Sequence, residues 1–440
     1  MTDQTSQGFK RVLGRWDSIA IGIGIVIGVG IFRVPAEVAK YLSFPVFILS
    51  AWIIGGIISL IGAFCYAELS SSFPETGGNY IYLRNSYGRL TGFLFGWTEL
   101  VVIRTGSIAS VSLIFAEYFS SFLSLANVWI KPIAVAAIFL LSLLNIIGLA
   151  YSSRVQSVVT LAKIGALACI VVFGLFSNKG DVAHFLNFPE SLDVGLISSL
   201  GLALIPILWT YGGWHEAVFV AGETRGAQKS LPFALITTMI IVISIYFFMN
   251  VLYLYLISPN EMAQSNLVAS DVFQILFGIH GRKLLELLII IYALGCINAM
   301  IITGSRVTYA MAKDNRLFGY LGKADPKFGT PMQSIMLNAL LAIGFVLVGT
   351  FEKLLFFTGG AVWLFFALVG GSLIILRRKF PKIERPYSVP LYPWVPLLFI
   401  FICSALFLNT IIFYPLQSFI GLAIVLAGIP VFMVSTGMKK

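Results

Sequence analysis

The sequence predicts an all-α integral membrane protein with about twelve transmembrane helices. Of its 440 residues, 58% are hydrophobic and only 11% are charged, and the mean hydropathy is +0.94. Soluble domains are roughly half apolar and roughly one quarter charged, so a water-soluble core cannot hide this much apolar surface. The apolar residues form runs of about 20 residues, which is the length that a helix needs to cross a bilayer.

Twelve such runs follow one another along the chain, and short polar segments separate them. The predicted spans are Ser18–Leu42, Val46–Leu69, Gly92–Phe119, Pro132–Leu149, Val155–Phe176, Leu196–Val220, Pro232–Ile257, Leu284–Met311, Ser334–Val348, Leu354–Leu376, Val395–Leu408 and Ser418–Val434. A short helix outside the bilayer is also predicted between the seventh and eighth spans, at Ala269–Phe277.

The distribution of Lys and Arg predicts the orientation. The formal net charge is +10, but the positive residues lie in short loops between apolar runs, which is a pattern of membrane topology and not of nucleic-acid binding. With the N-terminus inside, 19 Lys and Arg fall on the cytoplasmic side and 6 on the outer side. Cytoplasmic loops are the more basic ones. We therefore expect both termini in the cytoplasm, a multi-pass location in the cell membrane, contact with membrane lipid and none with nucleic acid.

Four basic residues remain, and all of them fall within predicted spans: Arg33, Arg104, Lys163 and Arg306. A charge at the centre of a bilayer costs about 2.5–3.5 kcal/mol on insertion scales, so each of these residues needs a partner or water. The side chains of Arg33 and Arg306 are long enough to reach the interface from within a span, and Arg306 lies well away from the centre of its span. Lys163 lies deeper in its span and is the hardest to explain as a surface residue.

Glycines interrupt the first and the sixth span. The first span contains Gly28-Val29-Gly30, and the sixth contains Pro206 followed by Tyr211-Gly212-Gly213. Glycine and proline both weaken helices. Close packing of small residues between membrane helices explains either cluster taken alone. Their matching places in two successive blocks of five spans favour two inverted repeats with a transport site between the broken helices.

A helix break at membrane depth frees main-chain N–H and C=O groups, which are tolerated only inside protein or beside water. The second half of the first span is expected to begin near Val29–Gly30, where free N–H groups and the helix dipole suit a carboxylate. The first half is expected to end near Val26–Gly28, where free carbonyls suit an ammonium group. A second set of such groups is expected at Trp209–Gly212. An α-amino acid carries both charges and fits this arrangement.

A series of motifs runs from the first span to the loop after the eighth. Its members are Gly28-Val29-Gly30-Ile31-Phe32, Tyr66-Ala67-Glu68-Leu69, Phe73-Pro74-Glu75-Thr76-Gly77-Gly78-Asn79-Tyr80, Tyr82-Leu83, Trp209-Thr210-Tyr211-Gly212-Gly213-Trp214, Gly222-Glu223 with Leu231-Pro232, and Ser305-Arg306 with Tyr309-Ala310-Met311-Ala312-Lys313-Asp314. In composition and order the series resembles the amino acid–polyamine–organocation (APC) superfamily, and within it the L-type amino acid transporters (LAT-like) of prokaryotic type.

The resemblance implies a LeuT-type fold, in which two inverted repeats of five spans, with helices 1 and 6 broken, are joined by two further helices. Residues 1–17 would form a cytoplasmic segment. Residues 18–376 would form the ten-helix transport core, with 18–176 as the first repeat and 196–376 as the second. Residues 377–440 would form the two additional helices and a cytoplasmic tail. Such a protein carries its substrate by alternating access.

The resemblance also implies which residues form the site. Substrate contacts would come from the main chain of Val26, Ile27, Gly28, Val29, Gly30, Trp209 and Gly212. The side chain of Trp209 would be a gate over the substrate. Lys163 matches a lysine that takes the place of a coupling cation in sodium-independent relatives, and it would hold the break of span 1 and residues of span 8 such as Ser305. No bound sodium, other metal or cofactor is therefore expected.

The sequence departs from the family pattern at two positions. Val29 stands where the family often has Ser or Ala, and Gly226-Ala227 replaces the usual Asn-Pro. Eukaryotic LAT subunits join a heavy chain through a cysteine between spans 3 and 4, and Ser120–Lys131 has no cysteine. No disulfide-linked partner is therefore expected. The four cysteines lie within apolar runs and have no metal-like spacing: Cys65, Cys169, Cys296 and Cys403.

Other functions stay open to different degrees. The sequence has no H-E-x-x-H motif and no P-loop, so an enzyme is not predicted. A channel would favour rings or stripes of polar residues. Within transport, exchange of neutral L-amino acids, proton symport, and uptake of cationic amino acids or polyamines remain alternatives. Glu99 and Glu117 are candidate partners for a cationic substrate side chain, and Lys163 could carry a proton for symport.

Overall fold

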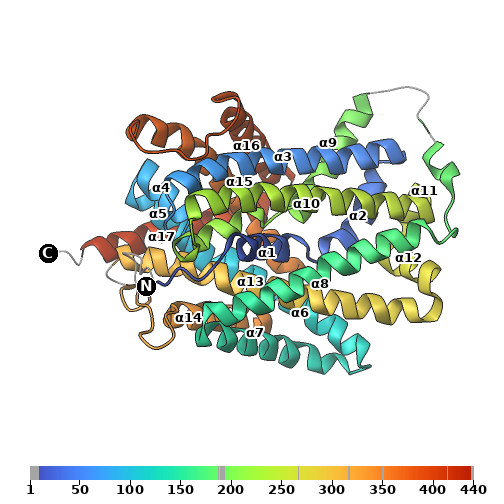
Figure 1. The fold of residues 1–440 in the computed structure, drawn as a ribbon, viewed down its shortest axis with the longest axis horizontal. Coiled ribbons are helices and arrows are strands. Elements are labelled where there is room, and N and C mark those ends of the chain that lie inside the picture. The colour runs from blue at the N-terminus through green and yellow to red at the C-terminus, as the bar shows by residue number, and fades with distance from the viewer. Residues whose placement is uncertain are drawn as a thin grey trace.

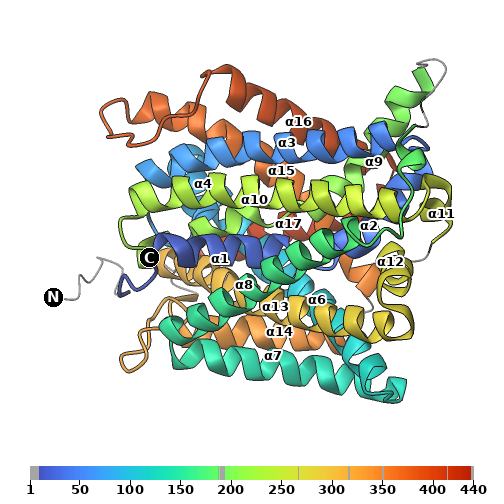
Figure 2. The same ribbon diagram turned by 45° about the vertical axis from the view of Figure 1, so that its right-hand side comes forward.

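The computed structural model describes residues 9–186, 188, 194–265, 267–315, 318–348, 351–413 and 415–437. Within these residues the regular structure is helical, and an isolated bridge pairs Leu13 with Thr224. Most of the long helices run roughly along one axis of the molecule, as Figures 1 and 2 show. The predicted all-α class is therefore confirmed.

The helices follow the predicted spans closely. In chain order they are α1 (Arg15–Val26), α2 (Gly30–Tyr41), α3 (Pro45–Ser72), α4 (Asn79–Tyr87), α5 (Arg89–Thr98), a π-helical turn η1 (Glu99–Ile103), α6 (Arg104–Phe122), η2 (Asn127–Trp129), α7 (Ile130–Ile147), α8 (Leu149–Leu175), η3 (Val182–Leu186), α9 (Val194–Thr210), η4 (Trp214–Glu223), α10 (Ala227–Leu256), α11 (Pro259–Gln264), α12 (Val268–Phe277), η5 (Gly278–His280), α13 (Gly281–Asp314), α14 (Met332–Val348), α15 (Phe351–Lys379), α16 (Trp394–Phe413) and α17 (Pro415–Gly437).

Nine helices of the described chain are long and apolar enough to cross a membrane, and the bent pair α1 and α2 makes a tenth. The helix α14 is apolar but shorter, and the predicted sixth span is divided between α9 and η4. The prediction of a multi-pass membrane protein with a broken first helix is confirmed, whereas the count of twelve spans stays a prediction. The predicted short helix between spans 7 and 8 is present as α12.

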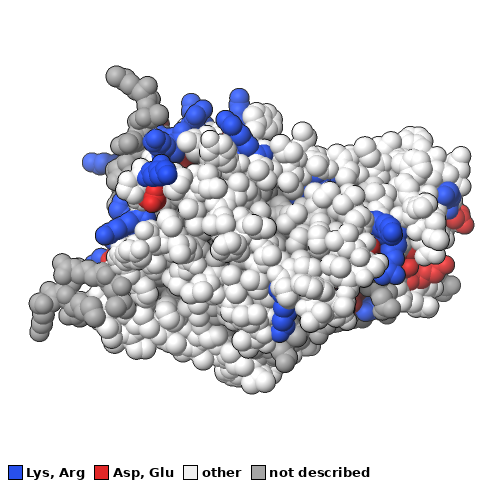
Figure 3. Space-filling model, turned by 90° about the horizontal axis from the view of Figure 1, so that it is seen from below, with Lys and Arg blue, Asp and Glu red and all other residues white. Residues whose placement is uncertain are grey.

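The distribution of surface charges agrees with a protein that spans a membrane. Figure 3 shows a face whose broad middle is almost free of charged side chains. Lys and Arg gather at one end of this face, and a smaller group of both signs lies at the other. An uncharged belt of this kind is what contact with the hydrocarbon core of a bilayer requires, because charges there are costly.

The helices differ in how far other helices enclose them. The segment α5–α6 and the helix α13 are the most enclosed, and α16 is the least. A large cluster of buried apolar residues joins α1, α2, α3, α9 and α10, which places both interrupted spans inside the protein. Their freed main-chain groups are thus kept from lipid, as the physics of a helix break demands.

Candidate functional site

The first span breaks where the glycines predict. The helix α1 ends at Val26, α2 begins at Gly30, and the two are bent by 46°. The last regular helical bond runs from the N–H of Ile27 to the carbonyl of Ile23, at 2.8 Å. The next N–H, that of Gly28, turns back to the carbonyl of Val26 at 2.8 Å. The carbonyls at the end of α1 therefore lose their usual helical donors.

Side chains from three other helices bond these carbonyls. The Nζ of Lys163 donates to the carbonyls of Gly24 and Ile27, at 2.8 and 3.0 Å. The hydroxyl of Tyr246 donates to Val26 at 2.7 Å, and the Sγ of Cys296 lies 3.6 Å from the carbonyl oxygen of Ile25. The sequence assigned the carbonyls of Val26 and Ile27 to a ligand, and the structure shows that protein side chains already bond them. The four main-chain carbonyls at the end of α1 therefore have side-chain donors from the protein itself, without a substrate.

At the start of α2, in contrast, main-chain groups are left without hydrogen-bond partners in the described chain. Among the described residues, the N–H groups of Val29, Gly30 and Ile31 have no hydrogen-bond acceptor, while that of Phe32 reaches the carbonyl of Val29 at 3.2 Å. Gly28 and Val29 are partly exposed although their neighbours on both sides are buried. Free N–H groups at a helix N-terminus carry partial positive charge and bind anions. This part of the predicted site can receive a carboxylate.

The sixth span breaks at Tyr211–Gly213. The helix α9 ends at Thr210, and a 3₁₀ helix, η4, begins at Trp214. Gly213 has φ = +97°, which favours glycine, and a Cβ there would collide with Ile25 of α1. The N–H of Gly212 bonds the carbonyl of Trp209 at 3.0 Å. Among the residues that the structure describes, the carbonyl of Thr210 receives a single long contact of 3.4 Å, from the hydroxyl of Tyr246.

The two breaks meet each other. A Cβ on Gly30 would lie 2.8 Å from the Cγ2 of Thr210, so the first residue of α2 touches the last residue of α9. The N-terminal end of one helix, with partial positive charge, thus lies beside the C-terminal end of another, with partial negative charge. Trp209, the predicted gate, is 42% exposed next to this junction.

Replacing Gly30 with alanine tests this contact. The added methyl group would press on Thr210, and forcing atoms into a packed site costs about 1–3 kcal/mol. We expect Gly30→Ala to disturb the junction and to reduce ligand binding, measured as loss of ligand-induced thermal stabilisation. Gly165→Ala is the control, because a Cβ there meets nothing within 4 Å. Adding Thr210→Ser, which removes the opposing methyl group, is expected to restore binding. Equal effects of the two alanine variants would contradict the contact.

Lys163 lies in the middle of α8 and is fully buried. Its ammonium group lies 5.5 Å from the ring centre of Tyr292, and a Cβ on Gly295 would lie 3.1 Å from its Cε. Glycine at position 295 of α13 therefore leaves room for the lysine side chain. The structure thus places the Lys163 side chain beside the break of span 1 and against α13.

Ser305 lies elsewhere. It is ten residues beyond Gly295 on α13, which corresponds to about 15 Å along a helix. Its hydroxyl donates to the carbonyls of Ile301 and Ile302 and accepts from Arg306 at 3.0 Å. The structure does not bring Ser305 to Lys163, because α13 meets the break of span 1 through residues near Tyr292 and Cys296 instead.

Sequence reasoning missed two buried carboxylates on η4. Glu216 accepts from the Nη1 of Arg104 at 2.6 Å and from the hydroxyl of Thr303 at 2.7 Å. Glu223 binds Arg306 through two hydrogen bonds, at 2.9 and 3.0 Å. A usable signal was present, because arginines inside spans need partners and these two glutamates lie in the sixth span and just beyond it. The expectation that Arg306 reaches the interface was wrong: its side chain is 0% exposed.

Glu99 and Glu117, the two carboxylates that could pair with a cationic substrate side chain, lie in different surroundings. The carboxylate of Glu99 accepts from the Nε of Arg104 at 3.0 Å and is buried. Glu117 lines a polar cavity of about 610 Å³ together with Asp271, Arg282 and Glu286. None of the residues that line this cavity belongs to either helix break. Neither carboxylate is thus a free partner at the junction of α2 and α9.

Comparisons with known proteins agree with this architecture. The family model described as amino acid permease matches residues 13–434. The chain is 33% identical to the serine/threonine exchanger SteT of Bacillus subtilis, over 98% of each chain. It is 31% identical to the human cystine/glutamate transporter, over 96% of this chain and 85% of that protein. It is 30% identical to the mouse large neutral amino acids transporter small subunit 2, over 96% of this chain and 80% of that protein.

The family match covers nearly the whole chain and includes both interrupted spans and every helix from α1 to α16. The match to SteT is equally complete. The chain therefore belongs to the amino acid permease family of the APC superfamily, within its LAT-like branch, and is a membrane transporter of amino acids and not an enzyme.

Proposed function

We propose that this transporter exchanges neutral L-amino acids across the cell membrane by alternating access and without sodium. The observation that carries the proposal is the junction of the two interrupted spans, where Gly30 of α2 meets Thr210 of α9. It offers free N–H groups on one side and incompletely bonded carbonyls on the other. An amino acid has a carboxylate and an ammonium group at the spacing that such a junction can bind.

In this proposal the substrate head group binds main-chain atoms. The carboxylate takes the N–H groups of Val29, Gly30 and Ile31, because they lack acceptors within the described chain. The ammonium group takes carbonyls at the end of α9, around Trp209 and Thr210, with Gly28 and Gly212 giving access to the main chain. Val26 and Ile27 bound the site, and Trp209 closes over it as the gate. Main-chain recognition leaves the substrate side chain to set specificity.

Lys163 supports independence from sodium. Its ammonium group already bonds two carbonyls at the end of α1, the place that a coupling cation would require. A second positive charge beside it would be repelled strongly in a buried site. The fixed charge of the lysine can therefore hold the broken helix in every turnover.

Exchange of neutral substrates is favoured over the alternatives by the relatives and by the charges at the junction. One relative is named an exchanger of serine and threonine, and another a transporter of large neutral amino acids. A cationic side chain would need a free carboxylate near the junction, but Glu99 is already paired with Arg104. Proton symport remains the alternative that experiment has to separate.

The same proposal includes the finer architecture. Residues 18–376 form a LeuT-type core of two inverted repeats, 18–176 and 196–376, and 377–440 add two helices to give twelve spans. The low enclosure of α16 supports a place outside the core. Both termini face the cytoplasm, as the excess of Lys and Arg indicates. The transporter works without a disulfide-linked heavy chain, because Ser120–Lys131 offers no cysteine.

The test is uptake of labelled L-serine and L-threonine into proteoliposomes. We expect saturable uptake that depends on unlabelled amino acid inside the vesicles and does not change when choline replaces sodium. Protein-free liposomes are the control. Uptake into empty vesicles that external acid drives would instead establish proton symport. Uptake that does not saturate would establish a channel.

A further inference from the structure

Two large aromatic rings are exposed where α1 and α10 begin. These helices lie side by side, and both begin at the same end of the molecule, as Figures 1 and 2 show. Trp16, in the first turn of α1, is 65% exposed, and Phe233, in the second turn of α10, is 41% exposed. Their ring centroids lie 6.0 Å apart in an edge-to-face arrangement. Tryptophan is a residue that membrane proteins favour at the boundary between hydrocarbon and headgroups.

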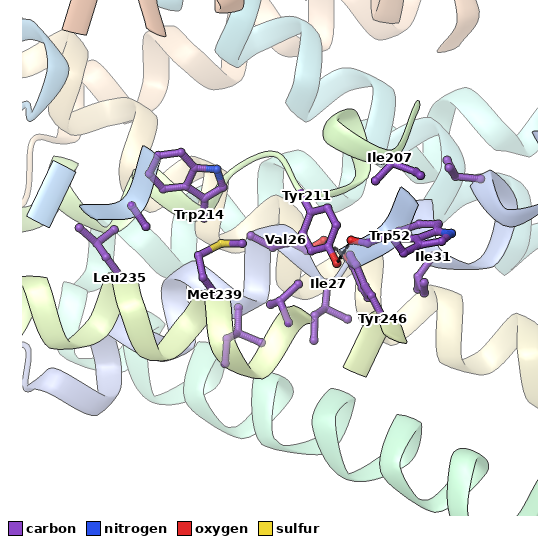
Figure 4. Packing of buried hydrophobic residues seen from close by; sticks show 14 of the residues in the cluster. Val26, Ile27, Ile31, Trp52, Ile207, Tyr211, Trp214, Leu235, Met239 and Tyr246 are labelled. Atoms are coloured by element: carbon purple, nitrogen blue, oxygen red, sulfur yellow. Dashed lines mark hydrogen bonds between the residues drawn. The ribbon is translucent and has the colours of Figure 1, made fainter. Parts of the chain in front are cut away.

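Phe233 takes no part in the buried packing of α10. Figure 4 shows Leu235 and Met239 of this helix inside the molecule, beside Trp214 and Val26. Both Leu235 and Met239 are 0% exposed. Residues two positions apart on a helix do not face the same side. The ring of Phe233 therefore faces the surroundings of the protein, while the opposite side of α10 packs in the core.

Three basic side chains accompany the two rings. The guanidinium carbon of Arg15 lies 5.6 Å from the centre of the Phe233 ring. Lys229 precedes Phe233 by four residues, which places it on the same face of α10. Arg225 lies just before α10, and all three basic residues are exposed. None of the three forms an ion pair with a carboxylate of the described chain.

The acidic residue in the first turn of α1 does not cancel this positive charge. It is Asp17, and its Oδ2 accepts from the N–H of Gly14 at 2.8 Å. Its Oδ1 accepts from the hydroxyl of Ser157, on α8, at 3.2 Å. Both oxygens of the carboxylate are thus bonded to other groups. An anion from outside the protein can therefore pair with Arg15 and Lys229, and bonds between charged groups are the strong ones.

Main-chain hydrogen bonds hold the two sides of this surface together. The N–H of Leu13 donates to the carbonyl of Glu223 at 3.0 Å, and the N–H of Arg225 donates to the carbonyl of Leu13 at 2.8 Å. The Nε of Arg225 also donates to the carbonyl of Arg11 at 3.0 Å. The segment before α1 is therefore tied to the turn before α10. A surface that is already arranged for its ligand loses less conformational freedom on binding.

We propose that this surface is a binding site for the headgroup of an acidic phospholipid. It consists of Arg15, Trp16, Arg225, Lys229 and Phe233. The lipid phosphate pairs with Arg15 and Lys229, since basic residues at the headgroup level attract anionic lipids. The two rings contact the glycerol and the upper part of an acyl chain. Because α1 is the first half of the broken span, a bound lipid stabilises it against α10. The inference depends on the membrane location of the chain and not on which amino acid it carries.

Quenching of Trp16 fluorescence by brominated lipids tests the proposal. The full-length protein is placed in phosphatidylcholine vesicles with a rising fraction of chain-brominated phosphatidylglycerol, and a parallel series uses brominated phosphatidylcholine. The chain has eight tryptophans, so the signal of Trp16 is the part of the quenching that Trp16→Phe loses. Arg15→Gln with Lys229→Gln removes two charges from the surface. Arg378→Gln with Lys382→Gln is the matched control, because these exposed basic residues lie at the end of α15 and just beyond it.

The expected result is a preference for the acidic lipid that depends on the two charges. Each basic residue near an acidic lipid surface strengthens attachment by about fivefold. We expect Trp16 to prefer phosphatidylglycerol over phosphatidylcholine by more than about tenfold, and Arg15→Gln with Lys229→Gln to reduce this preference by about tenfold. The control pair is expected to reduce it by less than about twofold. Equal reductions in the two double variants, or equal quenching of the wild type by both lipids, would overturn the proposal.

Free phosphate distinguishes a lipid from a soluble anion. Inorganic phosphate in large excess is expected to leave the quenching as it is in chloride of the same ionic strength, because a free ion gains nothing from the two rings. Loss of quenching in phosphate alone would overturn the lipid assignment. If the double glutamine variant does not fold, Arg15→Gln and Lys229→Gln are each compared with Arg378→Gln. An unchanged lipid preference in both single variants would also overturn the proposal.

Discussion

Replacing Lys163 with alanine is expected to reduce amino acid exchange by more than about tenfold. The substitution removes a fully buried ammonium group and leaves the carbonyls of Gly24 and Ile27 without donors. Each unpaired buried carbonyl costs about 1–3 kcal/mol. Water cannot replace the lysine unless the site opens, so α1 is expected to lose its fixed end. Counterflow in proteoliposomes measures the effect.

Lys179 offers a closely matched control. Its Nζ also donates to two main-chain carbonyls, those of Ile275 and Leu276, at 2.9 and 3.0 Å. The bonds of Lys179 lie at an exposed or half-buried surface, where water can take over both carbonyls. Lys179→Ala is therefore expected to keep near-wild-type exchange. If Lys163→Ala and Lys179→Ala reduced exchange equally, the number of lysine–carbonyl hydrogen bonds would matter, and the position of Lys163 at the helix break would not.

Lys163→Arg separates charge from shape. Arginine keeps a positive charge but is larger and planar, and Gly295 leaves room for little more than the lysine chain. We expect Lys163→Arg to be nearly as impaired as Lys163→Ala. Full activity of the arginine variant would show that any cation suffices, which would contradict a role that depends on bonding two particular carbonyls.

The break of the first span could be predicted from the sequence because it is local. Gly28 and Gly30 weaken the helix wherever it packs, and the structure interrupts it between Val26 and Gly30. The depth of Lys163 in the membrane could also be predicted, because its position within an apolar run does not depend on other spans. Both features follow from the composition of a few neighbouring residues and the thickness of a bilayer.

The partners across the site could not be predicted in the same way. Tyr246 bonds a residue 220 positions away, and Arg306 bonds Glu223 across 83 positions. Such pairs depend on how each helix is rotated about its axis, which a hydrophobic run does not fix when a helix is enclosed on most sides. The error over Arg306 has this origin. Its place near the end of a predicted span indicated water, but α13 continues to Asp314 and neighbouring segments cover it.

The pair Arg306–Glu223 carries the second large prediction. Their side chains are 0% and 2% exposed, and the pair joins the end of η4 to α13. Removing one partner of a buried ion pair typically costs about 3–5 kcal/mol, because the other charge remains in a medium that cannot solvate it. Arg306→Met is therefore expected to lower the thermal unfolding temperature of the purified protein strongly. Lys40→Ala, which breaks the exposed pair with Glu37, is expected to leave it nearly unchanged.

The double variant Arg306→Met with Glu223→Met distinguishes two origins of that loss. If the cost comes from the uncompensated carboxylate, removing the carboxylate as well should recover most of the stability, since apolar replacements of buried pairs are often neutral. Glu223 also presents its main-chain carbonyl to the N–H groups of Val12 and Leu13, and both substitutions retain that contact. A double variant as unstable as Arg306→Met would show that the pair itself holds η4 against α13. An Arg306→Met variant as stable as Lys40→Ala would contradict the burial of the charge altogether.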